Sequence, residues 1–288
     1  MLDNQTKYTV DEHYVSRFVV ENFADARGYV QVVDIANDPP ACYKLLPKNI
    51  LYERDMYEFR NADGTYFDRN AVENWFSSIE NVLAPELRDV LHNQKAAPGV
   101  KREKEAWMAL LLAFQLVRIP AIKKLFANAD LSKACNTESE SLFRNAFYHM
   151  ALRSDRHAFN YLEGNGLTLS EADKKLLGGK SLLSEVASFI LSECFIYLMT
   201  SENRPFCLPD MPVLIDAFQD AKYIYPVAPR HAIACCLFST ASQSQADGFA
   251  FVDDSTVKVI NQLLIGKATR HVICNPYDKK EVIELMGG

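Results

Sequence analysis

The sequence contains no run of 18 or more apolar residues, which is the length that a helix needs to cross a bilayer. It also lacks a charged and then apolar leader at its start, so neither a membrane anchor nor a secretion signal is expected. Its seven cysteines are odd in number, irregularly spaced and without a CxxC pair. This pattern is more typical of a reducing compartment than of a disulfide framework, and it predicts a cytoplasmic protein with no membrane partner.

Several motifs with well-defined chemistry are also missing. There is no GxGxxG after a strand, no GxxxxGK[ST], no HExxH and no GxSxG. P-loop nucleotide hydrolases, zincin metalloproteases and α/β-hydrolases are thereby excluded. Zinc is not expected either, because Cys235 and Cys236 lie in a strand-like run that sends neighbouring side chains to opposite faces.

The composition is that of an acidic globular protein. The net charge is -6, the pI is about 5.6, and 49% of the 288 residues are hydrophobic, enough for a substantial core. An acidic balance disfavours loose, charge-driven binding to nucleic acid, although it is compatible with a local basic groove.

The order of the periodic segments predicts a single α+β domain over residues 1–288. Residues 1–69 form a small mixed N-terminal part, with a strand expected at 28–36. Residues 70–194 are mainly helical, and residues 195–288 are rich in β-type runs. We expect the segment 29–35 to join the strands after Phe195 in one sheet region, flanked by the central helices.

The β-rich C-terminal part contains several predicted strands. Two runs on either side of the turn Ser201–Pro205 are typical of a β-hairpin. Further strands are expected at 223–238, 248–254 and 270–275. A helix at 255–265 is predicted between the last two.

A histidine stands just before the first helical pattern, in the stretch 11–25. The apolar residues of this stretch recur at helical spacing and predict one buried face: Val15, Phe18, Val19, Val20 and Phe23. The ring of His13 either acts as a general acid, a general base or a metal ligand, or it hydrogen-bonds a backbone group where the chain enters the helix. We favour the first interpretation slightly, because the apolar residues already anchor the segment.

Two later helices carry polar residues of interest. Asn70 followed by Glu73 is typical of a capping pair, and it predicts the start of a long amphipathic helix. The segment 106–126 is apolar nearly all round and predicts a buried helix bent at Pro120.

Gln115 and Arg118 lie three residues apart on this apolar helix and therefore share one buried face. A buried arginine needs a partner. Arg118 either clamps a carboxylate, such as that of Glu80 or Asp210, or presents its planar fork to an anionic ligand.

These segments resemble, in order and spacing, the family of bacterial and archaeal proteins grouped as domain of unknown function 4238. The opening residues are similar to its signature His-x-x-Pro-x-x-x-Leu-x-x-Phe, and the later segments follow its pattern over almost the whole chain: His13 to Phe23, Leu51 to Tyr57, Val72 to Glu80, Gln115 with Arg118 and Pro120, the stretch 205–213, Tyr225 to Pro229, and Asn261. Two positions depart from the pattern. Ser16 replaces the signature proline, and Leu208 with Pro209 replaces two hydroxyl residues before Asp210. The resemblance implies a shared fold and a set of candidate residues, but no reaction.

Two functional hypotheses follow from these residues. In the first, His13, Asp210 and Arg118 are catalytic and Gln115 and Asn261 bind the substrate of a hydrolytic enzyme. The substrate would carry phosphate, as a nucleic acid or a nucleotide does. The cofactor would be Mg²⁺, held by some of His13, Glu80 and Asp210, and the biological role would be host defence.

In the second hypothesis the protein is a non-catalytic interaction or sensing module, and the same polar residues form a buried network that specifies the fold. Asp210 is relevant to the choice, because an aspartate in a turn between prolines often bonds its own backbone. Convergence of the three catalytic candidates around an open pocket favours the enzyme, whereas sealed or dispersed side chains favour the module.

Overall fold

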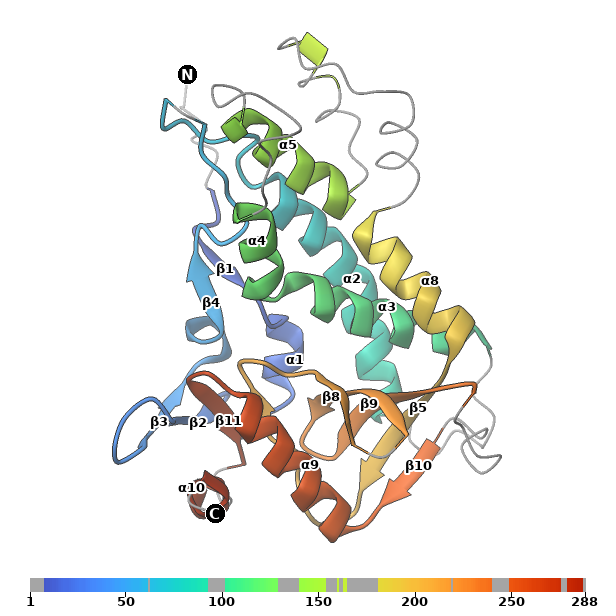
Figure 1. Cartoon of the computed structure of the whole chain (residues 1–288). Coiled ribbons are helices and arrows are strands. Elements are labelled where there is room, and N and C mark those ends of the chain that lie inside the picture. The colour runs from blue at the N-terminus through green and yellow to red at the C-terminus, as the bar shows by residue number, and fades with distance from the viewer. Residues whose placement is uncertain are drawn as a thin grey trace. The chain divides into compact units, whose positions relative to one another are not determined.

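Strands in the N- and C-terminal parts and helices between them give the protein an α+β fold, as the sequence predicts (Figure 1). The computed structural model describes residues 8–61, 63–92, 102–128, 140–153, 160, 163–164, 181–218, 220–239, 249–275 and 279–286. The chain divides into two compact units. Unit 1 comprises residues 1–14, 52–81 and 117–185, and unit 2 comprises residues 15–51, 82–116 and 186–288. The assignment of all 288 residues to one domain stays a prediction.

Unit 1 is built on a small antiparallel ribbon and several helices. Strand β1 (Asp11–His13) pairs with β4 (Tyr52–Arg54), so that Glu12 lies opposite Glu53 and His13 opposite Tyr52. Helix α2 (Ala71–His92) begins in this unit and continues through Pro85. Helices α4 (Pro120–Ala127) and α5 (Glu140–Arg153) complete the described elements.

Helix α3 (Arg102–Arg118) is followed by α4 after a break at Ile119, with Pro120 in the first turn of α4. The bend of 51° confirms the break predicted at Pro120, since proline cannot continue the hydrogen-bond ladder of the preceding helix. The predicted burial is confirmed for α3 but is wrong for α4, which has no buried residue. Among the described helices, none is by itself long and apolar enough to span a bilayer, and the bent pair α3 and α4 meets that criterion only when the two are joined.

Unit 2 contains two sheets. One has the strand order β10-β5-β9-β8-β7 and the other β3-β2-β11-β6. The strands of the first are β5 (Cys194–Ser201), β7 (Leu214–Phe218), β8 (Ala221–Ala228), β9 (His231–Leu237) and β10 (Phe249–Val252). Those of the second are β2 (Val30–Asp34), β3 (Ala41–Leu45), β6 (Leu208–Pro209) and β11 (His271–Cys274). The remaining elements are α1 (Arg17–Glu21), the 3-10 turn η1 (Pro47–Asn49), α8 (Leu182–Glu193, which begins in unit 1), α9 (Asp254–Lys267) and α10 (Lys279–Met286).

Both sheets of unit 2 contribute to one hydrophobic core. Val33 of β2, Met199 of β5 and Leu264 of α9 belong to the same cluster of buried side chains. Strand β2 pairs antiparallel with β11, which confirms that the segment 29–35 joins a strand from the far end of the chain. The single sheet region that was expected is two sheets, because β5 and β7 to β10 pair among themselves. Burial of each large aliphatic side chain stabilises this arrangement by about 1.5–3 kcal/mol.

Three local predictions are wrong in detail. The runs around Ser201–Pro205 do not form a hairpin, because β5 pairs with β9 and β10 whereas β6 pairs with β11 in the other sheet. The helix expected in the stretch 11–25 is reduced to the single turn α1, preceded by strand β1. Asn70 precedes α2 as predicted, but its side chain turns away from the helix and into the network described below.

Candidate functional site

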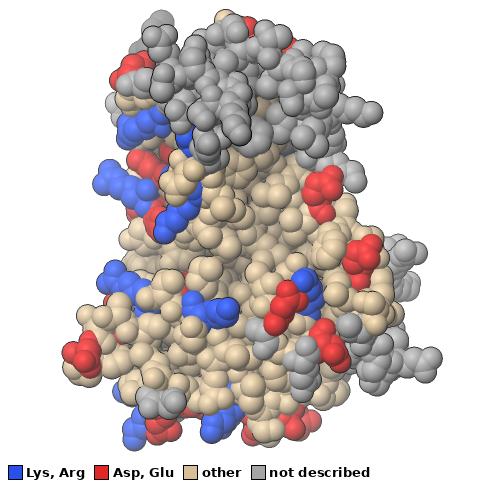
Figure 2. All heavy atoms as spheres, viewed as in Figure 1, with Lys and Arg blue, Asp and Glu red and all other residues tan. Residues whose placement is uncertain are grey.

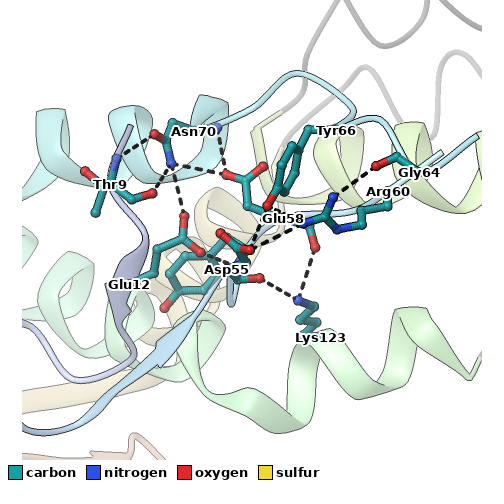
Figure 3. A network of polar contacts seen from close by, with 10 residues as sticks. Thr9, Glu12, Asp55, Glu58, Arg60, Gly64, Tyr66, Asn70 and Lys123 are labelled. Atoms are coloured by element: carbon teal, nitrogen blue, oxygen red, sulfur yellow. Dashed lines mark hydrogen bonds and ion pairs between the residues drawn. The ribbon is translucent and has the colours of Figure 1, made fainter. Parts of the chain in front are cut away.

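Two buried carboxyl groups in unit 1 share one amide (Figure 3). Glu12 of β1 is fully buried, and Glu58, four residues after β4, is 8% exposed. The Nδ2 atom of Asn70 lies 3.3 Å from Oε1 of both. Two backbone N–H groups complete the set: Tyr57 N donates to Glu12 Oε2 at 2.7 Å, and Asn70 N donates to Glu58 Oε1 at 2.7 Å. We call Glu12, Glu58 and Asn70 the carboxyl network.

The local backbone explains why these side chains meet. Asn70 has a φ of 60°, in the left-handed region that asparagine tolerates better than most residues. Its side chain then faces Thr9, accepting from Thr9 N at 2.8 Å and donating to Thr9 O at 2.8 Å. Asn70 thus fixes the chain just before β1 and holds Glu12 in place, as Figure 3 shows.

The network changes the proton affinity of its acids. Burial raises the pKa of Glu12 to about 8, opposed by the Tyr57 N–H and reinforced by the nearby charges of Glu58 and Glu73. Burial likewise raises the pKa of Glu58 and raises the pKa of Glu73 to about 6. Since two buried carboxylates cannot both ionise at low cost, the pair holds a proton near neutral pH. It has the proton affinity of a general acid or base.

One cation lies beside this pair. Lys123 of α4 donates from Nζ to the carbonyl oxygens of Asp55 and Glu58, at 3.1 and 3.2 Å. Burial lowers the pKa of Lys123, whereas the charges of Glu12 and Glu53 act in the opposite direction. The lysine therefore ties α4 to the segment that follows β4.

Arg118 is buried and paired with a carboxylate, as predicted. Its side chain is 1% exposed, and Nη1 forms an ion pair with Glu80 of α2. Nη2 donates to the carbonyl oxygen of His13 at 2.5 Å, and Nε donates to the Tyr57 hydroxyl at 3.4 Å. The ring of Phe76 lies 4.9 Å from the guanidinium carbon. Arg118 therefore joins α3 to α2 and to the end of β1.

His13 enters this arrangement through its backbone. Its carbonyl oxygen accepts from Arg118 and from the Tyr57 hydroxyl, the latter at 3.0 Å. Its half-buried ring lies against Tyr52, with centroids 5.7 Å apart and planes tilted by 55°. His13, Arg118 and Glu80 are thus brought together in unit 1, but the contacts that join them use the main chain of His13.

The other predicted residues lie in unit 2, where each forms a local bridge. Asp210 follows β6 and accepts from the backbone N–H groups of Thr269, Arg270 and His271 at 2.7–3.2 Å. The hydroxyl of Thr269 also donates to it, at 2.6 Å.

The side chains of Gln115 and Asn261 also form hydrogen bonds within unit 2. Gln115 Oε1 accepts from the Tyr225 hydroxyl at 3.0 Å. Asn261 of α9 accepts from Cys207 N at 3.0 Å and donates to the carbonyl oxygen of Pro205 at 2.9 Å. Among the residues that the structure describes, no group of three or more His, Cys, Asp or Glu side chains is arranged to hold a metal ion.

A second polar feature of unit 1 lies at its surface. The guanidinium of Arg69 lies between the rings of Tyr8 and Tyr66, 4.3 Å from each centroid. Arg60 covers Tyr66 at 3.9 Å and also approaches Asp55 at 3.7 Å. We call Tyr8, Arg69, Tyr66 and Arg60 the aromatic–basic ladder. Its two ends are open, because Tyr8 is 44% exposed and the Arg60 side chain 53% exposed.

The sequence-based choice of candidates missed the carboxyl network and this ladder. Glu12 adjoins His13, and Glu58 directly follows the acidic stretch 51–57, so both lay beside residues that were chosen. Asn70 was the residue that could have indicated the carboxyl network, but its pattern with Glu73 was interpreted only as a helix cap. Three members of the ladder, Arg60, Tyr66 and Arg69, lie within ten residues of one another, and only Tyr8 comes from a distant part of the sequence, so the stretch 60–69 held a local signal for it.

Comparison of the chain with curated proteins and with solved structures gives no match. A family model described as protein of unknown function (DUF4238) matches residues 12–278, from the buried Glu12 of β1 to the segment after β11. The match includes the carboxyl network, Arg118 and all the bridges of unit 2, and the chain therefore belongs to the DUF4238 family.

Proposed function

We propose that the protein is a non-catalytic interaction or sensing module. The observation that carries this proposal is the burial of Arg118, the residue expected to clamp an anionic ligand. Its guanidinium is 1% exposed and engaged by Glu80, by the His13 carbonyl and by Tyr57. A guanidinium enclosed in this way stabilises the fold and presents no open face to a phosphate.

The remaining catalytic candidates support the same proposal. Asp210 is 3% exposed and its oxygens accept several backbone N–H groups of the segment 269–271. Asn261 and Gln115 are likewise bonded within unit 2. Polar residues used in this way specify a fold rather than a reaction.

We assign the partner surface of this module to the aromatic–basic ladder. Aromatic rings and guanidinium planes stack on nucleobases whatever their sequence, and arginine also attracts phosphate. A nucleobase that carries phosphate, in single-stranded nucleic acid or in a free nucleotide, fits the exposed ring of Tyr8 and the exposed charge of Arg60. On the face in Figure 2, basic and acidic side chains are interspersed, so that we expect stacking to contribute more than long-range charge. We place this activity in the cytoplasm, on the cysteine pattern of the chain.

A binding titration tests the ladder. Labelled single-stranded RNA and DNA and a fluorescent nucleotide are titrated separately with the full chain, and polarisation is measured at two salt concentrations. Tyr8→Ala should weaken binding at least about fivefold, since one stacked base contributes about 1–3 kcal/mol. Tyr29→Ala removes a ring of similar exposure, 40%, in unit 2 and should have no effect. Arg60→Ala should also weaken binding. Its control is Arg17→Ala, which removes a similarly exposed arginine and should leave binding unchanged. Absence of binding by every probe, or equal losses in the controls, would contradict the assignment.

A second candidate function is the hydrolytic enzyme on phosphate-bearing or nucleic-acid substrates, with a role in host defence. The observation that favours it is the carboxyl network, because the pKa of Glu12 near 8 suits proton transfer at neutral pH. Phosphomonoester, phosphodiester and single-stranded RNA hydrolysis, with and without Mg²⁺, are compared between the wild type and Glu12→Gln. A folded Glu12→Gln variant with unchanged turnover would exclude this acid–base role, and phage challenge of cells that express each form tests the biological part.

A further inference from the structure

The edge of the four-stranded sheet in unit 2 places two cysteines opposite each other. Strands β6 and β11 run antiparallel, with Ile273 opposite Leu208 and Val272 opposite Pro209. The same register, continued by one residue, places Cys274 of β11 opposite Cys207, the residue that directly precedes β6.

The hydrogen bonds show which kind of pair this is. Asp210 N donates to His271 O at 2.9 Å, so that Asp210 and His271 form a hydrogen-bonded pair. Such pairs alternate with non-hydrogen-bonded ones along an antiparallel ladder. Pro209, which has no N–H, falls in a non-hydrogen-bonded pair, and so does Cys207, whose N–H donates to Asn261 Oδ1 instead.

Non-hydrogen-bonded positions bring two strands closest together. Their Cα atoms are about 4.5 Å apart, whereas a disulfide spans Cα separations of about 4.4–6.8 Å. Cys207 and Cys274 belong to the same buried cluster, and both sulfurs are thiols in this structure. The backbone is thus already placed for a bond between them.

Both thiols line one small pocket. Its volume of about 10 Å³ has room for about one water molecule, and its wall also includes Asn261 of α9 and Leu285 of α10. The exposed fractions of Cys207 and Cys274, 3% and 2%, limit direct access from bulk solvent. A disulfide reagent should therefore reach them when the two-residue strand β6 separates from β11 at the edge of the sheet.

We propose that Cys207 and Cys274 are a modification site, a cross-strand dithiol that low-molecular-weight disulfides oxidise to a protein disulfide. The thiolate of one cysteine attacks a sulfur of the small disulfide, forms a mixed disulfide and releases one small thiolate. The thiolate of the second cysteine then attacks the protein sulfur of that mixed disulfide and releases the other. Two electrons pass to the small disulfide, and the two protons lost by the cysteines end on the two released thiolates.

The product ties β6 to β11. The bridge closes a long loop between residues 207 and 274, which includes strands β6 to β11, and it restricts the unfolded state. Oxidation should therefore raise the melting temperature of the full chain by several degrees, and a reductant should reverse the rise. Transient disulfides of this kind in a reducing compartment typically report redox conditions.

Peptide mapping without reduction tests the site. The full-length protein is incubated with oxidised glutathione, free thiols are blocked, and the digest is analysed by mass spectrometry. We expect a peptide pair joined between Cys207 and Cys274, lighter by two hydrogens than its parts, together with the reversible rise in melting temperature. The proposal is overturned if both cysteines carry only glutathione, stay unmodified, or are joined to other cysteines.

A trivalent arsenical, phenylarsine oxide, provides a second measurement because it binds two neighbouring thiols at once. Wild type and Cys42→Ala, which removes an exposed cysteine elsewhere in unit 2, should bind one arsenical at this site, in addition to any held by the contacting thiols of Cys194 and Cys235. Cys207→Ala and Cys274→Ala should each lose it while keeping the far-UV circular dichroism of the wild type. If either variant fails to fold, the wild-type peptide map decides, since it depends on no substitution. Equal arsenical binding by a folded Cys274→Ala variant would refute the pair.

Discussion

Glu12 and Glu58 meet around the single amide nitrogen of Asn70, which lies 3.3 Å from an oxygen of each. This shared amide and one backbone N–H for each carboxyl group do not compensate two buried negative charges, so that the folded protein retains a proton which the unfolded chain releases. The free energy of unfolding must therefore depend on pH.

The sign of this dependence follows from the pKa of Glu12, which folding raises from 4.5 to about 8. Between these values the native state binds more protons than the unfolded state, and the contribution of Glu12 is full below pH 4.5 and lost as the pH rises through 8. Glu12 alone should lower the free energy of unfolding in urea over this window by at most about 1.4 kcal/mol per pH unit. Glu12→Gln should remove this part of the slope. Glu53→Gln, on the exposed residue opposite Glu12, should leave the curve unchanged, and a Glu12→Gln curve parallel to that of the wild type would contradict the shared proton.

Removal of the Arg118 guanidinium should destabilise the fold. Arg118→Ala leaves Glu80 without its cation and the His13 carbonyl without one of its two donors, and we expect a loss on the order of 3 kcal/mol in urea unfolding. Arg118→Met fills most of the volume but restores neither contact, and should recover only part of the loss. Glu80→Gln should cost less, since Glu80 is 25% exposed. A loss below 1 kcal/mol for Arg118→Ala would show that the buried pair contributes little.

Substitution of the His13 ring should scarcely affect stability. The main chain of His13 makes its contacts with Arg118 and Tyr57, and these survive in His13→Gln. We expect the melting temperature to change by no more than a few degrees. Phe23→Ala is the comparison, because it opens a cavity at a 4% exposed side chain and should cost about 3–5 kcal/mol. If His13→Gln melts as early as Phe23→Ala, the ring is a structural brace.

Asp210 should prove essential to the edge of the four-stranded sheet. Asp210→Ala removes the acceptor for three N–H groups and the Thr269 hydroxyl, and a loss of about 3 kcal/mol is expected from the buried donors left without it. Hydrogen exchange should accelerate at Thr269, Arg270 and His271. Asp210→Asn keeps one oxygen acceptor, so its free energy of unfolding should lie between those of the wild type and Asp210→Ala. Unchanged exchange at all three amides in Asp210→Ala would exclude this role.

Most elements could be predicted from the sequence because their signals are local. The apolar run of β9, the turn before β11 and the proline that separates α3 from α4 each depend on a few neighbouring residues. The choice of strand partners is different. The runs around Ser201–Pro205 have hairpin composition, yet β5 and β6 enter different sheets because each finds a better partner far along the chain.

The same distinction applies to the polar residues. An arginine on an apolar helix predicts a buried ion pair, since a buried charge needs a partner, and the pairing with Glu80 was within reach of the sequence. The meeting of Glu12 with Glu58 was not. It depends on the closure of the chain between β1 and β4 and on the left-handed backbone of Asn70, and neither leaves a periodic signal.

The pairing of β2 with β11 also sets the order of events during synthesis. All five residues of β2 are buried, and one of its two neighbours, β11, is made about 240 residues later. At translation rates of about 5–20 residues per second, that interval lasts roughly 12–48 s. During this interval β2 and β3 form a two-stranded hairpin, and the edge of β2 that later pairs with β11 has no partner strand. The nascent chain therefore carries an aggregation-prone strand edge until β11, which begins at residue 271 of 288, emerges, and a message truncated before residue 271 should give an insoluble product.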